Sequence, residues 1–310
     1  MSEGTATGAV AATRRRARRR RARRVGGLSE LPYLVPVLAV ITVVVLIPAG
    51  VAFYHSFTDW RPGGESPWLG LANYREFLSS EVTREIVENT AILLLGVPLW
   101  TALPLVLAFA LHERTPATGV FQAIFFFPAV LSPAIIGIMF RGILAPEGLV
   151  NEVLLSIGIV SEPVLWLDNA ALVKPTLILV LAWASVGAGT VIFSAAMTSI
   201  DKHLLEAAKL DGAGWIARLR YVVLPGIASV VAFWIVYQVV SVFLYVFGWI
   251  YVLTRGGPGY SSTTLDYDVY TNAFTNGLFG YAAAQAMMLL LIAVIVLVVG
   301  YPLARRTERA

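Results

Sequence analysis

The sequence offers few side chains that could catalyse a reaction or hold a nucleotide. A phosphate-binding P-loop ends in Gly-Lys followed by Ser or Thr, but none of the three lysines follows a glycine: Lys174, Lys202 and Lys209. There is no cysteine, which excludes disulfides, thiolate metal sites and cysteine nucleophiles. We therefore expect no catalytic residue, no metal and no cofactor in this chain, so any nucleotide that drives it must bind another subunit.

The most specific spacing of polar residues lies between residues 199 and 225. Asp201 can cap a short helix, and apolar residues such as Leu205 give that helix one apolar face. Asp211 and Gly212 should then end it, because glycine readily adopts the left-handed conformation of a helix C-terminus. A second amphipathic turn follows. The pattern predicts a helix-turn-helix that exposes apolar side chains to a partner protein.

The composition indicates what must carry this loop. Of the 310 residues, 58% are hydrophobic and only 14% are charged, whereas soluble domains carry about 25% charged residues. A membrane-crossing helix needs roughly 20 mostly apolar residues. Six stretches without Asp, Glu, Lys or Arg qualify: Leu31–Thr58, Asn89–Leu111, Thr115–Phe140, Pro175–Ile200, Tyr221–Thr254 and Asn276–Ala304. The fold class expected is an all-α integral membrane protein with six transmembrane helices. The fifth stretch is too long for one crossing, so we expect a bend at Leu224-Pro225 and a crossing that begins near Gly226.

The basic residues predict the orientation. If the six stretches cross a membrane in turn, 17 of the 23 Lys and Arg fall on the same side of it. The positive-inside rule then predicts a cell-membrane protein with this side and both termini in the cytoplasm. Nine arginines lie within residues 14–24, directly before the first span. We expect this arm to be an uncleaved orientation signal that contacts anionic lipid, not a nucleic-acid site.

The expected organisation is a basic arm at 1–30, a first transmembrane helix at 31–58, an extracytoplasmic segment at 59–88, a five-helix core at 89–304 that includes the 199–225 loop, and a cytoplasmic tail at 305–310.

The predicted spans contain no ionisable acid or base. Carriers coupled to protons or sodium usually need intramembrane carboxylates or histidines, and the histidines all lie at or beyond span ends: His55, His112 and His203. Four prolines should break two helices and leave backbone carbonyls unpaired: Pro98, Pro104, Pro128 and Pro133. Four small residues should form a weak, flexible patch within the fourth span and permit close contacts between helices: Ser185, Gly187, Ala188 and Gly189. Both features suit a bundle that moves around a pathway.

The 199–225 loop resembles the EAA loop of importer-type ABC transporter permeases, which have the MetI-like, type I importer fold. The matching residues are Glu206, Ala207, Ala208, Asp211, Gly212, Ala213, Leu224 and Pro225. A second match begins at Tyr251, includes Gly256-Gly257-Pro258 and continues to Gly280-Tyr281-Ala282-Ala283-Ala284. It is similar to the carbohydrate-uptake subgroup, specifically the maltose-type F-like subunit. Together the matches cover roughly residues 30 to 304.

The resemblance implies a mechanism and a set of partners. In that family the loop helix inserts into a cleft on a cytoplasmic ATPase subunit, and ATP with magnesium binds there and not to the permease. Closure of the ATPase dimer switches a pair of homologous permeases from inward-facing to outward-facing, and an extracytoplasmic solute-binding protein delivers the solute. By analogy, Glu206 makes polar contacts in the cleft, Ala207 and Ala208 allow close approach, and Gly212 shapes the turn.

The resemblance also indicates where a solute would pass. The sugar site of the maltose-type subunit aligns here with mostly apolar residues: Ala184, Ser185, Ala188, Val239, Val242, Phe243 and Val246. The polar and aromatic candidates on the same two helices are Trp183, Ser185, Tyr237, Gln238, Ser241 and Tyr245. Gln238, Ser241 and Tyr245 are three and four residues apart and therefore share one helix face. Alternatively, these aromatic residues pack the core, and the solute site belongs to the partner permease or to the binding protein.

These observations predict a permease subunit of an ATP-driven importer for a carbohydrate. Two alternatives stay open. The first is an importer for glycerol 3-phosphate or another polyol, although only Arg141 and Arg255 lie near enough to the spans to meet a phosphate. The second is a channel for neutral solutes that works without ATP, which has no need of an exposed amphipathic loop.

Overall fold

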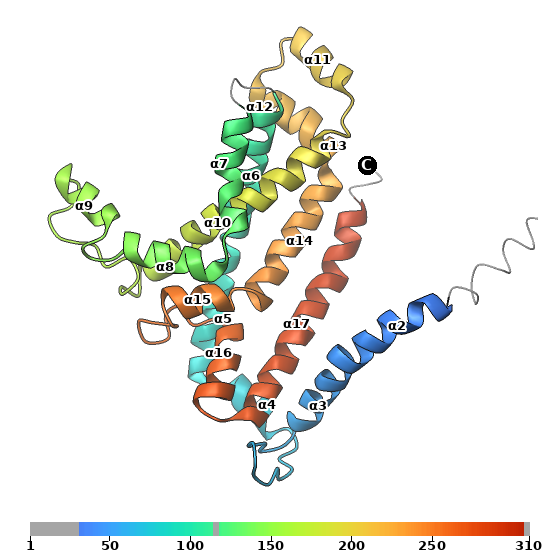
Figure 1. The fold of residues 1–310 in the computed structure, drawn as a ribbon, viewed down its shortest axis with the longest axis vertical. Coiled ribbons are helices and arrows are strands. Elements are labelled where there is room, and N and C mark those ends of the chain that lie inside the picture. Colours follow the sequence, from blue (N-terminus) through green and yellow to red (C-terminus); the bar gives the residue numbers. More distant parts are fainter. Residues whose placement is uncertain (1–30, 114–117, 307–310) are drawn as a thin grey trace, which may run out of the picture. The chain divides into compact units, whose positions relative to one another are not determined.

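The computed structural model describes residues 31–113 and 118–306, so the whole predicted basic arm and residues 307–310 of the predicted C-terminal tail lie outside these ranges. The described residues are helical apart from turns and one isolated bridge between Thr58 and Trp68 (Figure 1). The chain divides into two units, Met1–Tyr54 and His55–Ala310. Each unit is described by itself.

The first unit contains one continuous helical run. It consists of α2 (Leu31–Ile41), the π-helical η1 (Thr42–Leu46) and α3 (Ile47–His55). The run has no charged residue, and the stretch Tyr33–His55 is long and apolar enough to cross a membrane. The helix predicted at 31–58 therefore forms, although it ends three residues earlier than expected.

The second unit holds the remaining helices. In chain order they are α4 (Ala72–Ser79), α5 (Glu81–Leu94), α6 (Val97–His112), α7 (Thr118–Val130), α8 (Pro133–Ile143), α9 (Leu149–Ser156), α10 (Val173–Met197), α11 (Lys202–Leu210), α12 (Trp215–Arg218), η2 (Leu219–Val223), α13 (Leu224–Gly226), α14 (Ala228–Leu244), α15 (Phe247–Leu253), α16 (Leu265–Tyr270), η3 (Thr271–Thr275) and α17 (Phe279–Arg306).

In the described part of the chain, four stretches are long and apolar enough to cross a membrane as single helices, and two bent helix pairs raise the number to as many as six. The six crossings thus stay a prediction.

The third predicted span is sharply broken, because α7 and α8 meet at 115°. Proline is well suited to the first turn of a helix but cannot continue one, and Pro133 opens α8. The Ser132 hydroxyl accepts a hydrogen bond from the amide of Ile135 and caps the new helix. The prediction that prolines break a helix is confirmed at Pro133, and Pro98 likewise lies in the first turn of α6, which is separate from α5. Pro104 and Pro128 instead lie inside α6 and α7.

The fifth uncharged stretch, Tyr221–Thr254, is not a single crossing helix. An 82° bend separates the segment Trp215–Gly226 from α14, which agrees with the bend expected near Gly226. However, α14 ends at Leu244, and the separate short helix α15 follows. The absence of charge in a sequence cannot reveal this second break, since Tyr245 and Val246 are uncharged like their neighbours.

In the second unit, α6 packs against α10 and α14. Its buried side chains include Phe109, Phe193 and Trp234. A Cβ atom on Gly189 of α10 would lie 2.7 Å from Pro104 and 3.0 Å from Trp234. The small-residue patch in α10 therefore allows helices to approach closely. Helix α10 runs unbroken from Val173 to Met197 through this patch, so the expected flexibility of the patch stays a prediction.

Candidate functional site

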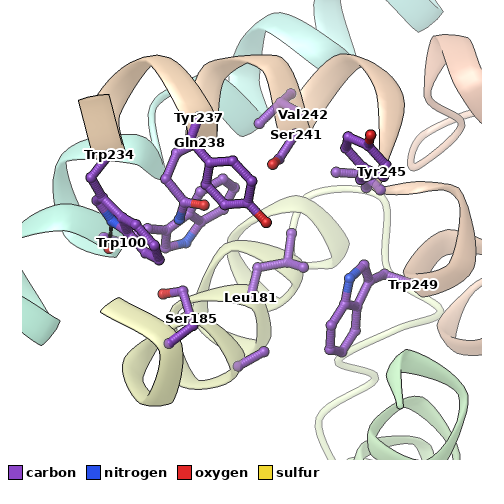
Figure 2. Close-up of a pocket in the computed structure, with 13 residues that line it drawn as sticks. Trp100, Leu181, Ser185, Trp234, Tyr237, Gln238, Ser241, Val242, Tyr245 and Trp249 are labelled. Atoms are coloured by element: carbon purple, nitrogen blue, oxygen red, sulfur yellow. Dashed lines mark hydrogen bonds between the residues drawn. The ribbon is translucent and has the colours of Figure 1, made fainter. Parts of the chain in front are cut away.

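Four helices of the second unit surround a cavity of about 190 Å³. The helices are α6, α10, α14 and α15, and Figure 2 shows side chains of α14 projecting toward α10. The lining residues are Trp100, Leu181, Ala184, Ser185, Ala188, Trp234, Tyr237, Gln238, Ser241, Val242, Tyr245, Val246 and Trp249. None of these side chains carries a charge at neutral pH.

The cavity brings together five of the six residues predicted for the solute pathway: Ser185, Tyr237, Gln238, Ser241 and Tyr245. The sixth, Trp183, is not among the lining residues. Its ring lies edge-on against Phe140 of α8, with the ring centroids 5.2 Å apart. Of the residues aligned with the maltose-type site, Val239 and Phe243 do not line the cavity either.

Three tryptophans in the lining were not predicted: Trp100, Trp234 and Trp249. Trp234 could have been found, because it precedes Gln238 by one helical turn and so lies on the same face of α14. Trp100 carries no such signal. It lies in α6, 134 residues before Trp234 in the sequence, and contacts α14 only in the folded chain.

Hydrogen bonds hold two of these indoles in place. The Nε1 of Trp234 donates to the carbonyl oxygen of Trp100 at 3.0 Å, and the Nε1 of Trp100 donates to the carbonyl oxygen of Ile178 at 2.9 Å. Both side chains are almost fully buried. Because their N–H groups are already used, these two tryptophans can offer only ring surface to a solute.

Free hydrogen-bonding groups come from α14 instead. The hydroxyl oxygen of Ser241 is buried and has no hydrogen-bond partner within the described residues, and the Gln238 amide also makes no hydrogen bond there. Buried polar atoms are normally paired, so an unpaired hydroxyl in a cavity wall suits a ligand group. Aromatic faces with a few placed hydrogen-bonding groups are typical of sites for neutral polar molecules such as sugars.

A second hollow, of about 480 Å³, differs in charge. Its lining includes Arg141 of α8 and Arg255, which follows α15. Arg255 has a positive φ of 52°, a conformation that side-chain-bearing residues adopt rarely.

The predicted helix-turn-helix forms in the 199–225 loop. The Asp201 carboxylate accepts a hydrogen bond from the amide of His203 and caps α11. At the other end, Gly212 has a φ of 78°, and the amide of Ala213 donates to the carbonyl of Ala208. The cap and the left-handed turn are both confirmed.

The loop presents two different surfaces. Leu205 is 8% exposed and packs into the core formed by α6 and α10, and the ring of Trp215 lies 4.9 Å from that of Phe109. In contrast, Leu210 is 89% exposed and Ile216 is 74% exposed. Glu206, Ala207, Asp211 and Gly212 are exposed as well, while Ala208 and Ala213 are half-buried. An exposed face with both apolar and acidic groups is suited to contact a partner.

Comparison with known proteins places this geometry in a family. The family described as "Binding-protein-dependent transport system inner membrane component" matches residues 68–309. The chain is 32% identical to the diacetylchitobiose uptake system permease protein NgcF of Streptomyces coelicolor over 84% of this chain and 77% of that protein. It is 31% identical to the sn-glycerol-3-phosphate transport system permease protein UgpA of Agrobacterium fabrum over 85% and 91%.

A solved structure shares the fold. A chain of a bacterial ABC transporter involved in the import of the acidic polysaccharide alginate superposes with a TM-score of 0.77 at 22% identity, over 89% of this chain and 94% of that chain. The expected type I importer fold is therefore confirmed. The chain is a multi-pass membrane protein that belongs to the family of inner-membrane permease components of binding-protein-dependent ABC transport systems.

Proposed function

We propose that this chain is one of two transmembrane subunits of an ATP-driven importer for a neutral carbohydrate. The observation that carries the proposal is the uncharged cavity with exposed aromatic rings and the unpaired Ser241 hydroxyl. The permease NgcF, named for diacetylchitobiose, supports the same class of solute. A cavity of about 190 Å³ is smaller than the roughly 300–1,000 Å³ of typical small-molecule sites, so we expect a second permease to complete it.

In this proposal the 199–225 loop couples the permease to two cytoplasmic ATPase subunits. The exposed face that contains Glu206, Leu210 and Ile216 enters the ATPase cleft, and closure of the ATPase dimer moves the loop. An extracytoplasmic binding protein delivers the carbohydrate. The excess of basic residues supports a location in the cell membrane with both termini in the cytoplasm.

A second candidate solute is glycerol 3-phosphate or a related anion. The relative UgpA favours it, and so does the hollow lined by Arg141 and Arg255. The uncharged cavity argues against it, because a phosphate buried without a cation is costly.

The first experiment is gentle extraction of the tagged chain from native membranes, followed by identification of the proteins that co-purify. A second permease and an ATPase support the importer, and the complex can then be placed in vesicles with the binding protein for uptake of diacetylchitobiose or glycerol 3-phosphate. A lone chain that moves solute without ATP would instead establish the channel alternative.

The loop is tested in the same vesicles with the double variant Glu206→Ala and Gly212→Pro. Proline cannot adopt the positive φ of Gly212, so the turn should be lost and uptake should stop while the chain stays in the membrane. Glu65→Ala, which removes an exposed carboxylate from a different loop, serves as the control. Uptake by the double variant at the control rate contradicts the coupling role.

A further inference from the structure

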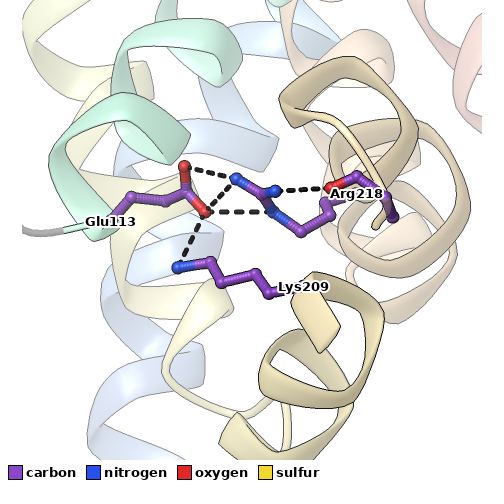
Figure 3. A network of polar contacts seen from close by, with 4 residues as sticks. Glu113, Lys209 and Arg218 are labelled. Carbon is purple, nitrogen blue, oxygen red and sulfur yellow. Dashed lines mark hydrogen bonds and ion pairs between the residues drawn. The ribbon is translucent and has the colours of Figure 1, made fainter. Parts of the chain in front are cut away.

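One carboxylate joins the loop to a helix of the bundle (Figure 3). Glu113, directly after α6, accepts from two nitrogens of Arg218 in α12, with Nη2 at 2.8 Å and 3.0 Å from its two oxygens and Nε at 3.2 Å. Lys209, at the end of α11, brings its Nζ within 3.3 Å of the same carboxylate. We call these three residues the Glu113 cluster.

The Glu113 cluster fixes both helices of the loop. Arg218 also donates from Nη1 to the carbonyl of Ala213, in the turn between α11 and α12, at 2.6 Å. A planar guanidinium that holds a carboxylate with two donors and a backbone carbonyl with a third has little freedom to move. The Arg218 side chain of α12 therefore connects the turn to the end of α6 through its hydrogen bonds.

Partial burial makes this contact stronger than an ordinary surface ion pair. The Arg218 side chain is 12% exposed and that of Glu113 is 17% exposed, whereas Lys209 is 50% exposed. Charges that are mostly removed from water are screened less by solvent and salt. Arg218 should thus contribute most of the attraction, and Lys209 should contribute little.

The other end of α6 reaches the cavity. Trp100 lines the cavity near the start of α6, and the amide of Glu113 donates to the carbonyl of Phe109 in its last turn. Thirteen residues at 1.5 Å each place the two ends about 20 Å apart. One helix therefore carries an aromatic wall of the cavity at one end and the Glu113 cluster at the other.

We propose that Glu113 is a positioning residue that transmits movement of the loop to α6, and through Trp100 to the cavity. The inference rests on the proposed function, since it needs an ATPase that moves the loop. Leu205 and Trp215 keep the loop attached by apolar packing without Glu113, but such packing can slide. The bidentate charged contact fixes direction as well as distance, so it makes the loop and α6 move as one body.

The absence of cysteine allows a direct test, because a single introduced cysteine is the only thiol of this chain, and modification is followed on this chain alone. Ala184→Cys places that thiol in the cavity wall. The complex as co-purified is placed in vesicles, and the rate at which a charged methanethiosulfonate reagent modifies the thiol is measured without nucleotide and with a non-hydrolysable ATP analogue. The ratio of the two rates reports how strongly nucleotide reshapes the cavity.

In the parent with Glu113 intact, the ratio should differ from one by at least about five-fold, the lower range of coupling between distant sites. Glu113→Gln keeps the shape of the side chain but removes its charge, and it should bring the ratio close to one while the ATPase still binds and hydrolyses ATP. The control Lys209→Gln, at the exposed edge of the cluster, should keep most of the response. The exchanged pair Glu113→Arg with Arg218→Glu should recover at least part of it, because the exchange restores the ion pair.

The outcomes separate the two proposals. An unchanged ratio in both Glu113→Gln and Arg218→Lys overturns the role of Glu113 and leaves the importer intact. A parent that shows no response to nucleotide overturns the importer and the Glu113 cluster together. Loss of the ATPase from the Glu113→Gln complex means that the cluster only holds the loop in shape and also overturns the inference.

Discussion

Trp234 donates its indole hydrogen to the carbonyl oxygen of Trp100, and Pro104 is the reason that this oxygen is free to accept. In an α-helix, the carbonyl of residue 100 accepts from the amide of residue 104, but proline has no amide hydrogen. Helix α14 therefore supplies the donor that α6 lacks. Trp100 and Trp234 are only 3% and 2% exposed, so water does not take this role.

Trp234→Phe should destabilise the protein by about 1–3 kcal/mol, because the buried carbonyl of Trp100 loses its partner. Pro104→Ala restores an amide donor inside α6. In that background, the cost of Trp234→Phe should fall by about 1 kcal/mol or more. Unfolding of the single and double variants in detergent measures the difference, and equal costs in both backgrounds would show that Pro104 and Trp234 act independently.

Ser241→Ala should leave the stability of the chain nearly unchanged or raise it slightly, because the hydroxyl makes no hydrogen bond within the described residues. If a solute hydroxyl pairs with Ser241, the same variant should raise the half-saturating concentration for uptake about 5- to 10-fold, equivalent to roughly 1–1.4 kcal/mol. Ser185→Ala is the matched control, since the Ser185 hydroxyl already donates to the carbonyl of Ala182 at 2.8 Å. Equal uptake by Ser241→Ala and the wild type removes Ser241 from the site.

A pH effect is expected at Asp266, whose carboxylate accepts hydrogen bonds from the Thr264 hydroxyl and from the backbone amide of Phe247, next to the cavity. Burial raises the pKa of Asp266 from its ordinary value of 3.8 to about 6, against the opposing effect of these hydrogen bonds. Between pH 3.8 and 6 the folded chain therefore holds a proton that the unfolded chain has released. Stability from this group is fully present below pH 3.8 and is lost as pH rises through 6.

The size of the loss is at most about 3 kcal/mol, from roughly two pKa units at 1.36 kcal/mol each. Asp266→Asn has no proton to release. The difference in unfolding temperature between the wild type and this variant should change between pH 4.5 and pH 7, with the wild type losing relative stability as pH increases. Burial also raises the pKa of Asp268, but that contribution is common to both proteins and cancels. A difference that stays constant with pH would contradict the assignment.

Two leucines of α11 should behave in opposite ways when shortened to alanine. Leu205→Ala empties part of the core and should cost about 2–5 kcal/mol of stability. Leu210→Ala changes an 89% exposed side chain, so its effect on stability should stay within about 0.5 kcal/mol. If the exposed face of the loop docks on an ATPase, Leu210→Ala should nevertheless weaken recovery of that subunit during purification. Full recovery of the ATPase would remove Leu210 from the interface.

The parts that could be predicted from the sequence are those that depend on neighbouring residues. The cap at Asp201 and the turn at Gly212 follow from local chemistry, and the break before Pro133 follows from the missing amide hydrogen of proline. The shared face of Gln238 and Ser241 follows from helical periodicity. In each case, the residues that decide the structure lie within about two helical turns of each other.

The parts that escaped prediction depend on contacts between distant segments. Glu113 and Arg218 are 105 residues apart, and each alone looks like a solvated surface charge. The break after Leu244 lies in a continuous apolar run, where neither charge nor proline marks it. Trp183, chosen for its place beside the aligned sugar site, packs on Phe140 because its neighbours Ala184 and Ser185 occupy the face toward the cavity.

The close approach of Gly189 to Pro104 and Trp234 has an evolutionary consequence. A Cβ at position 189 would lie 2.7 Å from Pro104 and 3.0 Å from Trp234, and Trp234 in turn supplies the hydrogen bond that Pro104 makes necessary. No one of the three positions can change without disturbing another. We expect positions 104, 189 and 234 to be inherited as a set, so that a descendant chain becomes free to lose the tryptophan only after it regains an amide at 104.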